Sequence, residues 1–334
     1  MQYILRRLIL TIPVIIGATL IVFLILHLIP GDPVDVIFAG TGASLEQKED
    51  FRHSMGLDLP LPVQYFRYLG NTLQGDFGQS IHYQRPVSEL IFERLPATIE
   101  LGLAGLLTGL IIALPAGIIS SVKRHSFIDY LVMTFATLGI SLPTFWVSIL
   151  LIMLFSGNLG WLPSFGRIDL MVEMDRITGF YLIDSLINKN LPAFKDTLTH
   201  LILPATALGI SAATLTARLV RSSMLEELNK DYVRAAQAKG LMDRKVLSHH
   251  VIRNALIPVI TIIGGMIGDL LGGSVIVETI FAWPGIGRLA IQAISTRDYA
   301  VVQGAVLFFA LIRIGVNLIT DFLYVVIDPR IGHI

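Results

Sequence analysis

The sequence has 334 residues, of which 54% are hydrophobic and 15% are charged, and its 25 basic side chains balance 25 acidic ones. Soluble domains carry about 25% charged residues, so this deficit and a mean hydropathy of +0.71 indicate a protein that crosses a membrane several times. Zero net charge gives no support for nucleic-acid binding, and the absence of cysteine excludes disulfides, thiolate metal sites and a thiol nucleophile.

The first apolar run, residues 8–29, contains no Asp, Glu, Lys or Arg. It is long enough to cross a bilayer, which takes roughly 20 apolar residues. Arg6 and Arg7 precede it, as basic residues precede a signal peptide. The run is too long for a signal sequence, however, and it leads into HLIPGDP at His27–Pro33 rather than into a cleavage site with small residues. We therefore expect residues 1–30 to be retained as an anchor helix.

Residues 31–93 are too long for a simple turn and carry two helix patterns. Ser44 and Gln47 form a capping-box pattern that opens a short helix ending before Gly56. Pro62 begins a second helix, and Gly75 follows it. The patterns predict a small helical cap after the anchor.

Five further apolar segments predict membrane spans at about 97–121, 128–156, 198–220, 255–280 and 300–327. Pro143 lies inside the second of these five and predicts a kink, because proline removes a backbone hydrogen bond. The kink serves either gating or packing. The pattern assigns no structure to residues 157–196. Apolar residues at helical spacing within 284–297 predict a short helix that lies flat at the membrane surface.

Lysine and arginine in short loops indicate orientation, because positively charged loops stay in the cytoplasm. Basic pairs stand before the first span, at Arg6–Arg7, and between the second and third, at Lys123–Arg124. Seven more basic residues lie between the fourth and fifth spans. Six spans threaded in turn put all three groups on one side. We expect that side to be cytoplasmic, with both chain termini and the tail 328–334 on it.

The charged segment, residues 222–258, separates the fourth and fifth spans. Leu225, Leu228, Tyr232 and Ala235 recur at helical spacing and predict one apolar face. Gly240 is a candidate end for this helix, and Asp243 is a candidate N-cap for a second one. An amphipathic helix in a loop buries its apolar face on lipid, on its own protein or in a groove of a partner.

Two strings in this segment, Tyr232–Gly240 and Arg253–Pro258, resemble the EAA loop of permease subunits in bacterial ABC importers, most closely the dipeptide/oligopeptide branch. Arg234 stands where many family members have Glu, and the interval from Gly240 to Pro258 is longer than in sugar permeases. Both departures are usual in the peptide branch. The strings HLIPGDP, GDFGQSI, RLPATIELG, ETIFAWPGIG and DPRIG extend the resemblance through nearly the whole chain.

The resemblance implies an all-α integral membrane protein with six transmembrane helices. The MetI-like fold of type I ABC permeases would cover residues 94–327, preceded by the anchor and a periplasmic cap over 31–93. It further implies a permease subunit in the inner membrane of a bacterium, which moves dipeptides or oligopeptides by alternating access. Related permeases carry nickel, glutathione or haem, and these substrates stay as alternatives.

The resemblance also implies partners. These are a second, paralogous permease, two cytoplasmic ATPase subunits that bind ATP and magnesium, an external substrate-binding protein and the lipid bilayer. The ATPase contact would lie in the coupling loop, residues 222–256, and at Pro258. It would use Tyr232, Arg234, Ala235, Ala236, Lys239 and Gly240. Small residues let a helix sit deep in a groove, and the basic ones can reach acidic groups at its rim.

Polar residues inside the last two spans are candidates for a translocation pathway. Asp269 lies deep in the fifth span, and Arg313, Asn317 and Asp321 recur at intervals of four in the sixth. Charges in a bilayer are costly, so these side chains should face protein or water, and they either line a pathway or pair with one another. In an ion-coupled secondary transporter or channel, the competing class, they would bind ions.

Gly264, Gly268 and Gly272 share one face of the fifth span and predict close helix packing, either within the chain or against a partner permease. Enzyme motifs are absent from the sequence: it contains no GxxxxGK[ST], HExxH or GxSxG. We therefore expect no catalysis and no bound cofactor in this chain.

Overall fold

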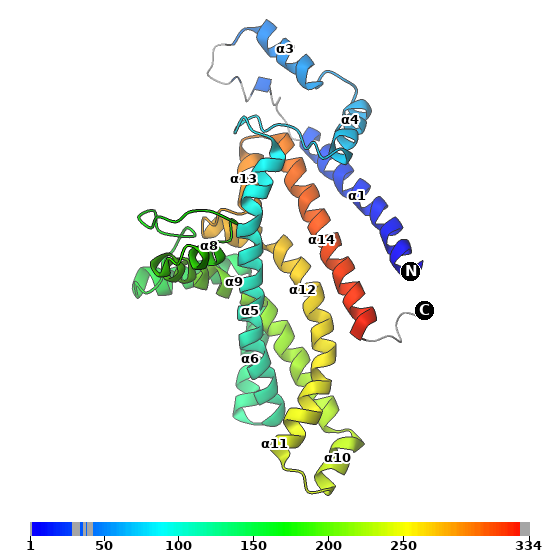
Figure 1. The fold of residues 1–334 in the computed structure, drawn as a ribbon, viewed down its shortest axis with the longest axis vertical. Coiled ribbons are helices and arrows are strands. Elements are labelled where there is room, and N and C mark those ends of the chain that lie inside the picture. Colours follow the sequence, from blue (N-terminus) through cyan, green and yellow to red (C-terminus); the bar gives the residue numbers. More distant parts are fainter. Residues whose placement is uncertain (1, 29–33, 36–37, 39–42, 328–334) are drawn as a thin grey trace. The chain divides into compact units, whose positions relative to one another are not determined.

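The computed structural model describes the chain except for residues 1, 29–33, 36–37, 39–42 and 328–334, and the described part is helical, without a β-strand (Figure 1). The chain divides into two compact units. Unit 1 comprises Met1–Thr98 and Pro284–Gly315, and unit 2 comprises Ile99–Trp283 and Val316–Ile334. Two long helices, α5 (Val87–Val122) and α14 (Tyr299–Ile327), contribute to both units.

Unit 1 holds α1 (Gln2–Leu28), α3 (Leu45–Met55), α4 (Leu61–Leu73) and α13 (Ile286–Ser295). The two short helices expected after the anchor are present. The capping box of α3 is complete, because Ser44 Oγ accepts from the Gln47 amide at 3.2 Å and Gln47 Oε1 accepts from the Ser44 amide at 2.9 Å. Gly56 ends α3 in the left-handed region, with φ of 67°.

The core of unit 1 buries the apolar face of α13. Ile286, Leu289 and Ala293 pack with apolar residues of α5 and α14. The short helix expected within residues 284–297 is therefore present, and its position at the membrane surface stays a prediction. A tight turn follows α13, in which the Asp298 amide donates to Ala293 O at 2.8 Å and the Asp298 carboxylate accepts from Ser80 Oγ at 2.5 Å. This turn folds α13 back onto α14.

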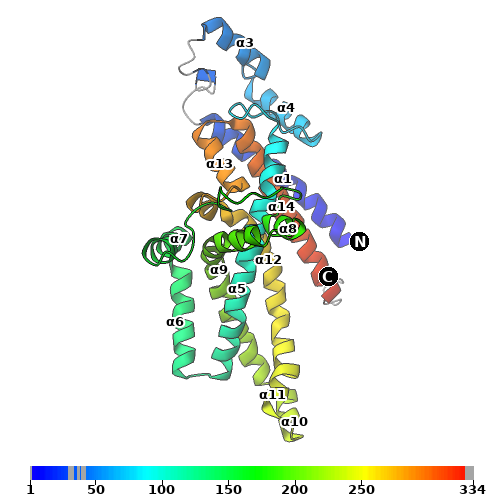
Figure 2. The same cartoon turned by 60° about the vertical axis from the view of Figure 1, so that its left-hand side comes forward.

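Unit 2 is built around α9 (Leu191–Leu228), which packs against α6 (Phe127–Ser141) and α12 (Ile252–Ile280) (Figure 2). Pro143 separates α6 from α7 (Thr144–Leu151), and the two helices are bent by 109°. The predicted kink is thus confirmed, although it is a full break. A π-helical turn over Ile152–Asn158 follows, and the loop 157–196, unassigned from the sequence, contains α8 (Tyr181–Ile187).

Four helical stretches in the described part are long and apolar enough to cross a membrane, and the α6–α7 pair adds a fifth if it forms one broken span. In α1 the described apolar stretch, Ile12–Leu24, is shorter than a span. The count of six transmembrane helices therefore stays a prediction. The observed helices are also longer than expected: α5 begins at Val87 rather than near 97, and α9 covers Leu191–Leu228 rather than 198–220.

Glycines let α5 and α9 approach each other closely in unit 2. A Cβ on Gly209 would lie 2.8 Å from Gly105 O and 2.9 Å from Gly109 N. A Cβ on Gly117 would lie 2.7 Å from Ala217 O. The backbones come this close because these positions carry no side chain. Sequence reasoning placed the small-residue face in α12 instead and missed this seam.

The glycine face predicted in α12 is only partly packed within the chain. Gly264 lies against Thr320 of α14, and Gly268 is buried. Gly272 has no atom of the described structure within 4 Å of the position of a Cβ. Packing within the chain is therefore found for Gly264, whereas packing of Gly272 against a partner permease stays a prediction.

Gly209→Ala should lower the unfolding temperature of the purified chain, because the added methyl meets backbone atoms that cannot move aside. Overpacking of this kind costs about 1–3 kcal/mol. Gly265→Ala, in a helix position with no neighbouring atom within 4 Å, is the matched control and should be neutral or slightly stabilising. Equal unfolding temperatures for the two variants would contradict the close approach of α5 and α9.

Candidate functional site

The charged segment folds as a compact end of unit 2. After α9 ends, α10 (Asp231–Ala238), α11 (Asp243–Val246) and a π-helical turn (Leu247–Val251) lead into α12. Gly240 follows α10 with φ of 77°, a conformation that side chains disfavour, and it turns the chain toward α11. Two short helices are therefore present, but the predicted N-cap is wrong: Met242 holds that position, and Asp243 is the first residue of α11.

A small apolar core holds this end together. Val220 and Met224 of α9 pack with Val233 of α10, and residues of the following turns and of α12 complete the cluster: Val246, Val251, Ala255 and Val259. Ala235, expected on the buried face, is exposed. The expected face fails there because the chain breaks between α9 and α10 at Asn229–Lys230, which resets the helical register and turns Val233 inward.

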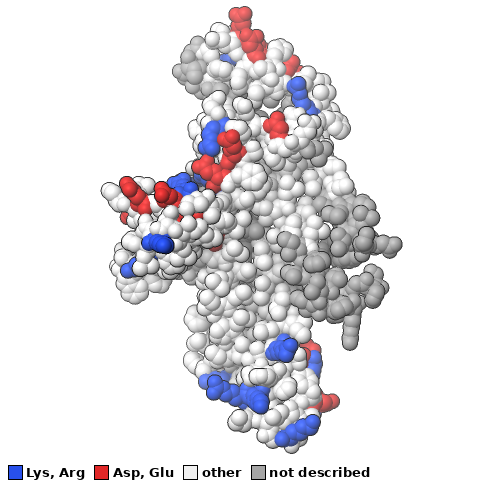
Figure 3. Space-filling view, viewed as in Figure 1, with Lys and Arg blue, Asp and Glu red and all other residues white. Residues whose placement is uncertain are grey.

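The exposed face of α10 carries small and charged residues, and Arg234 Nη1 lies 3.8 Å from Oδ1 of the exposed Asp231. Arg234, Ala235 and Lys239 are exposed, as is Gly240 beyond the helix, whereas Ala236 is half-buried against the core. Figure 3 shows lysine and arginine side chains gathered at this end of unit 2. The apolar side of α10 is thus covered by the chain itself, and small and charged side chains are left exposed.

Tyr232 ties α10 to the helices on either side. Its hydroxyl donates to the carboxylate of Glu227 at the end of α9 and accepts from Asn254 Nδ2 of α12 at 3.2 Å. Lys230 Nζ donates to Glu227 Oε1 at 2.5 Å. Burial raises the pKa of Tyr232, so its hydroxyl stays protonated and keeps its donor role.

The same residues line a recess of about 400 Å³ that reaches Pro258. Of the residues predicted for the site, the structure thus brings Tyr232 and Pro258 to one recess. Arg234, Ala235, Lys239 and Gly240 lie on the exposed face and do not line it. Displacing α10 would break hydrogen bonds to both α9 and α12.

An ion pair between a half-buried arginine and a buried aspartate attaches this end to α6. Arg221 of α9 donates from Nε and Nη2 to the two carboxylate oxygens of Asp129, each at 2.7 Å. Ser120 Oγ and the His125 amide donate to the same carboxylate. The bidentate geometry fixes α9 against the turn between α5 and α6.

The described structure does not test the grouping of polar residues predicted in the last spans. The side chains of Asp269 and Asp321 lie outside the described part. Arg313 and Asn317 are both exposed on α14. Their role in a pathway stays a prediction.

Sequence reasoning missed a buried ion pair in unit 2. Arg167 donates to Glu100 Oε2 from Nε at 2.9 Å and from Nη2 at 2.6 Å, and both side chains are about 5% exposed. Glu100 Oε1 also accepts from the Leu182 amide at 3.0 Å, and the Arg167 guanidinium lies 3.8 Å from the centre of the Tyr181 ring. The sequence draws attention to Glu100 because it is a carboxylate within an apolar span. No spacing pattern predicts that it pairs with an arginine 67 residues away.

Comparisons with known proteins agree along the whole chain. Residues 113–333 match the family described as binding-protein-dependent transport system inner membrane component, and residues 1–102 match the corresponding N-terminal family. The chain is 46% identical over 333 residues to the di/tripeptide transport system permease protein DppB of Pseudomonas aeruginosa (strain UCBPP-PA14), with 100% and 99% of the two chains covered. It is 44% identical over 336 residues to the dipeptide transport system permease protein DppB of Escherichia coli (strain K12), at the same coverage.

A solved structure gives the fold. The MetNI methionine ABC transporter in an inward-facing conformation superposes with a TM-score of 0.52 at 18% identity, covering 70% of this chain and 93% of that one. At this identity the likeness concerns the fold alone. The all-helical, MetI-like architecture expected from the sequence is thereby confirmed.

Proposed function

The chain belongs to the family of binding-protein-dependent transport system inner membrane components, and from this membership we propose that it is the permease subunit of an ATP-driven importer for dipeptides and short oligopeptides. The observation that carries the proposal is the near-half identity, over the full length, to permeases named for dipeptides and tripeptides. Nickel, glutathione and haem are the alternative substrates, and the similarity to peptide permeases favours peptide over them.

The proposed mechanism is alternating access driven by separate subunits. Two cytoplasmic ATPases would bind ATP and magnesium, and this chain would pair with a second, paralogous permease. The exposed face of α10 would sit in a groove of one ATPase. Because Tyr232 bonds to Glu227 and Asn254, a displacement of α10 pulls on α9 and α12 together. An external binding protein would deliver the peptide.

Purification of the tagged chain in mild detergent tests the proposal. We expect a second permease and P-loop ATPases to copurify, and we expect dipeptide together with its binding protein to stimulate ATP hydrolysis. The alanine dipeptide and nickel, added separately, distinguish two of the substrates. A chain that purifies alone and transports in liposomes without ATP would instead support the ion-coupled class, with Asp269 and Arg313 as the residues to mutate.

The proposed orientation, with both termini cytoplasmic, can be tested by thiol labelling, because the chain has no cysteine of its own. Ser54 of α3 and Ser248 of the charged segment are both exposed. In intact spheroplasts, a membrane-impermeant maleimide should label Ser54→Cys but not Ser248→Cys. Permeabilisation should expose Ser248→Cys to the reagent. The reverse labelling pattern would overturn the orientation.

A further inference from the structure

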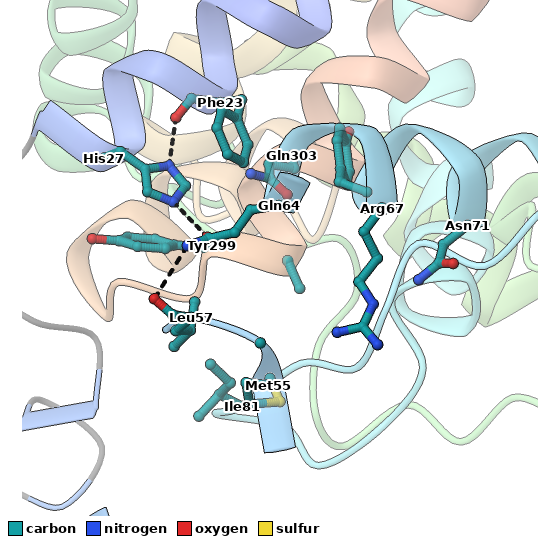
Figure 4. A pocket seen from close by; sticks show the side chains of 13 residues that line it. Phe23, His27, Met55, Leu57, Gln64, Arg67, Asn71, Ile81, Tyr299 and Gln303 are labelled. Atoms are coloured by element: carbon teal, nitrogen blue, oxygen red, sulfur yellow. Dashed lines mark hydrogen bonds between the residues drawn. The ribbon is translucent and has the colours of Figure 1, made fainter. Parts of the chain in front are cut away.

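Unit 1 contains a recess of about 190 Å³ between the end of α1, the helices α3 and α4, and the start of α14 (Figure 4). Apolar and aromatic groups form part of its wall, among them Phe23, Met55 and Tyr299. The rest of the wall is polar. A recess of this size is smaller than most ligand pockets, which run from about 300 to 1,000 Å³, and fits a single amino-acid residue better than a whole oligopeptide.

Arg67 is the arginine of the polar part of the wall. It extends from α4 beside Asn71, four residues on and therefore on the same helix face (Figure 4). No carboxylate in the described part of the chain lies within 4.0 Å of Arg67, unlike Arg85 and Arg167, which each have an acidic partner. The side chain is exposed, yet Nη1 lies 2.7 Å from where a Cβ of Gly56 would stand, so glycine at that position makes room for it.

His27 lies on the opposite wall of the recess. Its Nδ1 bonds to Phe23 O at 2.8 Å and its Nε2 to Gln64 Oε1 at 3.2 Å. The Gln64 amide is oriented by its nitrogen, which donates to Leu57 O and Leu59 O. Both ring nitrogens of His27 therefore have an oxygen partner within the chain.

Tyr68 also lines the recess, and burial raises its pKa to about 12, so its hydroxyl stays neutral. The described lining residues thus include arginine, histidine, amides and phenols but no acidic side chain. A guanidinium with amide donors close by is the arrangement that proteins use to hold a carboxylate.

We propose that this recess of unit 1 binds a carboxylate group, with Arg67 and Asn71 as its principal ligands. The carboxylate comes either from the C-terminal residue of a peptide or from an acidic side chain of the delivering protein. The inference that the recess binds a carboxylate depends on the residues of unit 1 alone. The two sources of that carboxylate depend on the proposed function.

The charge of the recess can be measured without transport. Met55→Cys places the chain's only thiol in the wall, and its reaction rates with an anionic (sulfonatoethyl) and a cationic (trimethylammonioethyl) methanethiosulfonate are compared in the full chain. Arg67→Gln should reduce the ratio of anionic to cationic rate on the order of fivefold, and Arg67→Lys should largely preserve it. Leu45→Cys, ten residues earlier in α3 and roughly 15 Å away, should show little change. An unaltered ratio at Met55→Cys in Arg67→Gln overturns the proposal.

The ligand is then tested in the assembled transporter by protection of the same thiol. Alanyl-alanine should slow labelling in the Arg67 protein and not in Arg67→Gln, and alanyl-alanine amide should not slow it. Protection by the peptide-free binding protein alone assigns the carboxylate to that protein, and protection by free dipeptide assigns it to the peptide. Equal protection by dipeptide and amide, or protection by neither dipeptide nor protein, overturns the proposal. None of these rates depends on ATP-driven uptake, so failure here is distinguishable from failure of the proposed function.

Discussion

Gly240→Trp should leave the chain inserted and assembled but reduce peptide uptake at least tenfold while ATP hydrolysis continues. Gly240 is exposed immediately after α10, and no atom of the described structure lies within 4 Å of the position of a Cβ, so a side chain there begins in open space. It does occupy the face through which the ATPase is proposed to move α10. Uptake and ATPase rates of the transporter in proteoliposomes, measured side by side, give the coupling ratio.

Backbone strain has to be separated from loss of docking, because the left-handed φ of 77° costs any side chain roughly 1–2 kcal/mol. Gly160→Trp is the matched control. Gly160 has a similar φ of 62°, belongs to the same unit and likewise has nothing within 4 Å. It lies outside the charged segment, so the same strain there should leave coupling intact. Unchanged uptake in Gly240→Trp would overturn the role assigned to α10.

Glu100→Ala should destabilise the chain by about 3–5 kcal/mol, because it leaves the buried Arg167 guanidinium without a counter-charge. The same change removes the acceptor of the Leu182 amide and so loosens the start of α8. The checks are the yield of folded protein and the unfolding temperature in detergent. Glu100→Ala combined with Arg167→Met should recover part of the loss, because no buried charge is then left unpaired.

An exposed pair provides the comparison for Glu100. Glu93 lies on the same helix and accepts from Arg85 Nη1 at 3.0 Å, with both side chains close to half exposed. Exposed pairs of this kind contribute about 0–1 kcal/mol, so Glu93→Ala should change the unfolding temperature little. If Glu100→Ala lowered the unfolding temperature no more than Glu93→Ala does, Arg167 would not be in an environment without water.

Local signals in the sequence predicted local structure well. The capping box at Ser44, the break at Pro143 and the turn at Gly240 depend on residues within a few positions, and each is found where the sequence indicates it. Helix periodicity was less dependable across a break. Ala235 fits a continuous helix with Leu225 and Leu228, but two residues of turn before α10 were enough to move it to the exposed face.

Contacts between distant segments could not be predicted from one sequence. Glu100 and Arg167 are separated by 67 positions, and the fit of Gly209 between Gly105 and Gly109 depends on how two helices cross. Glycines at intervals of four occur in α12 as well, where Gly272 meets no neighbour. Spacing therefore identifies a face that permits close approach, and the tertiary arrangement decides which of these faces is used.

The boundaries between the two units fall inside helices, and this has a mechanical consequence. The chain passes from Thr98 to Ile99 within α5 and from Gly315 to Val316 within α14, so at two of its three crossings it is a continuous helical rod. A flexible tether would let each unit rotate independently, but a helix resists bending and twisting along its length. A change in the arrangement of the units would therefore have to bend or twist α5 and α14 at these two points.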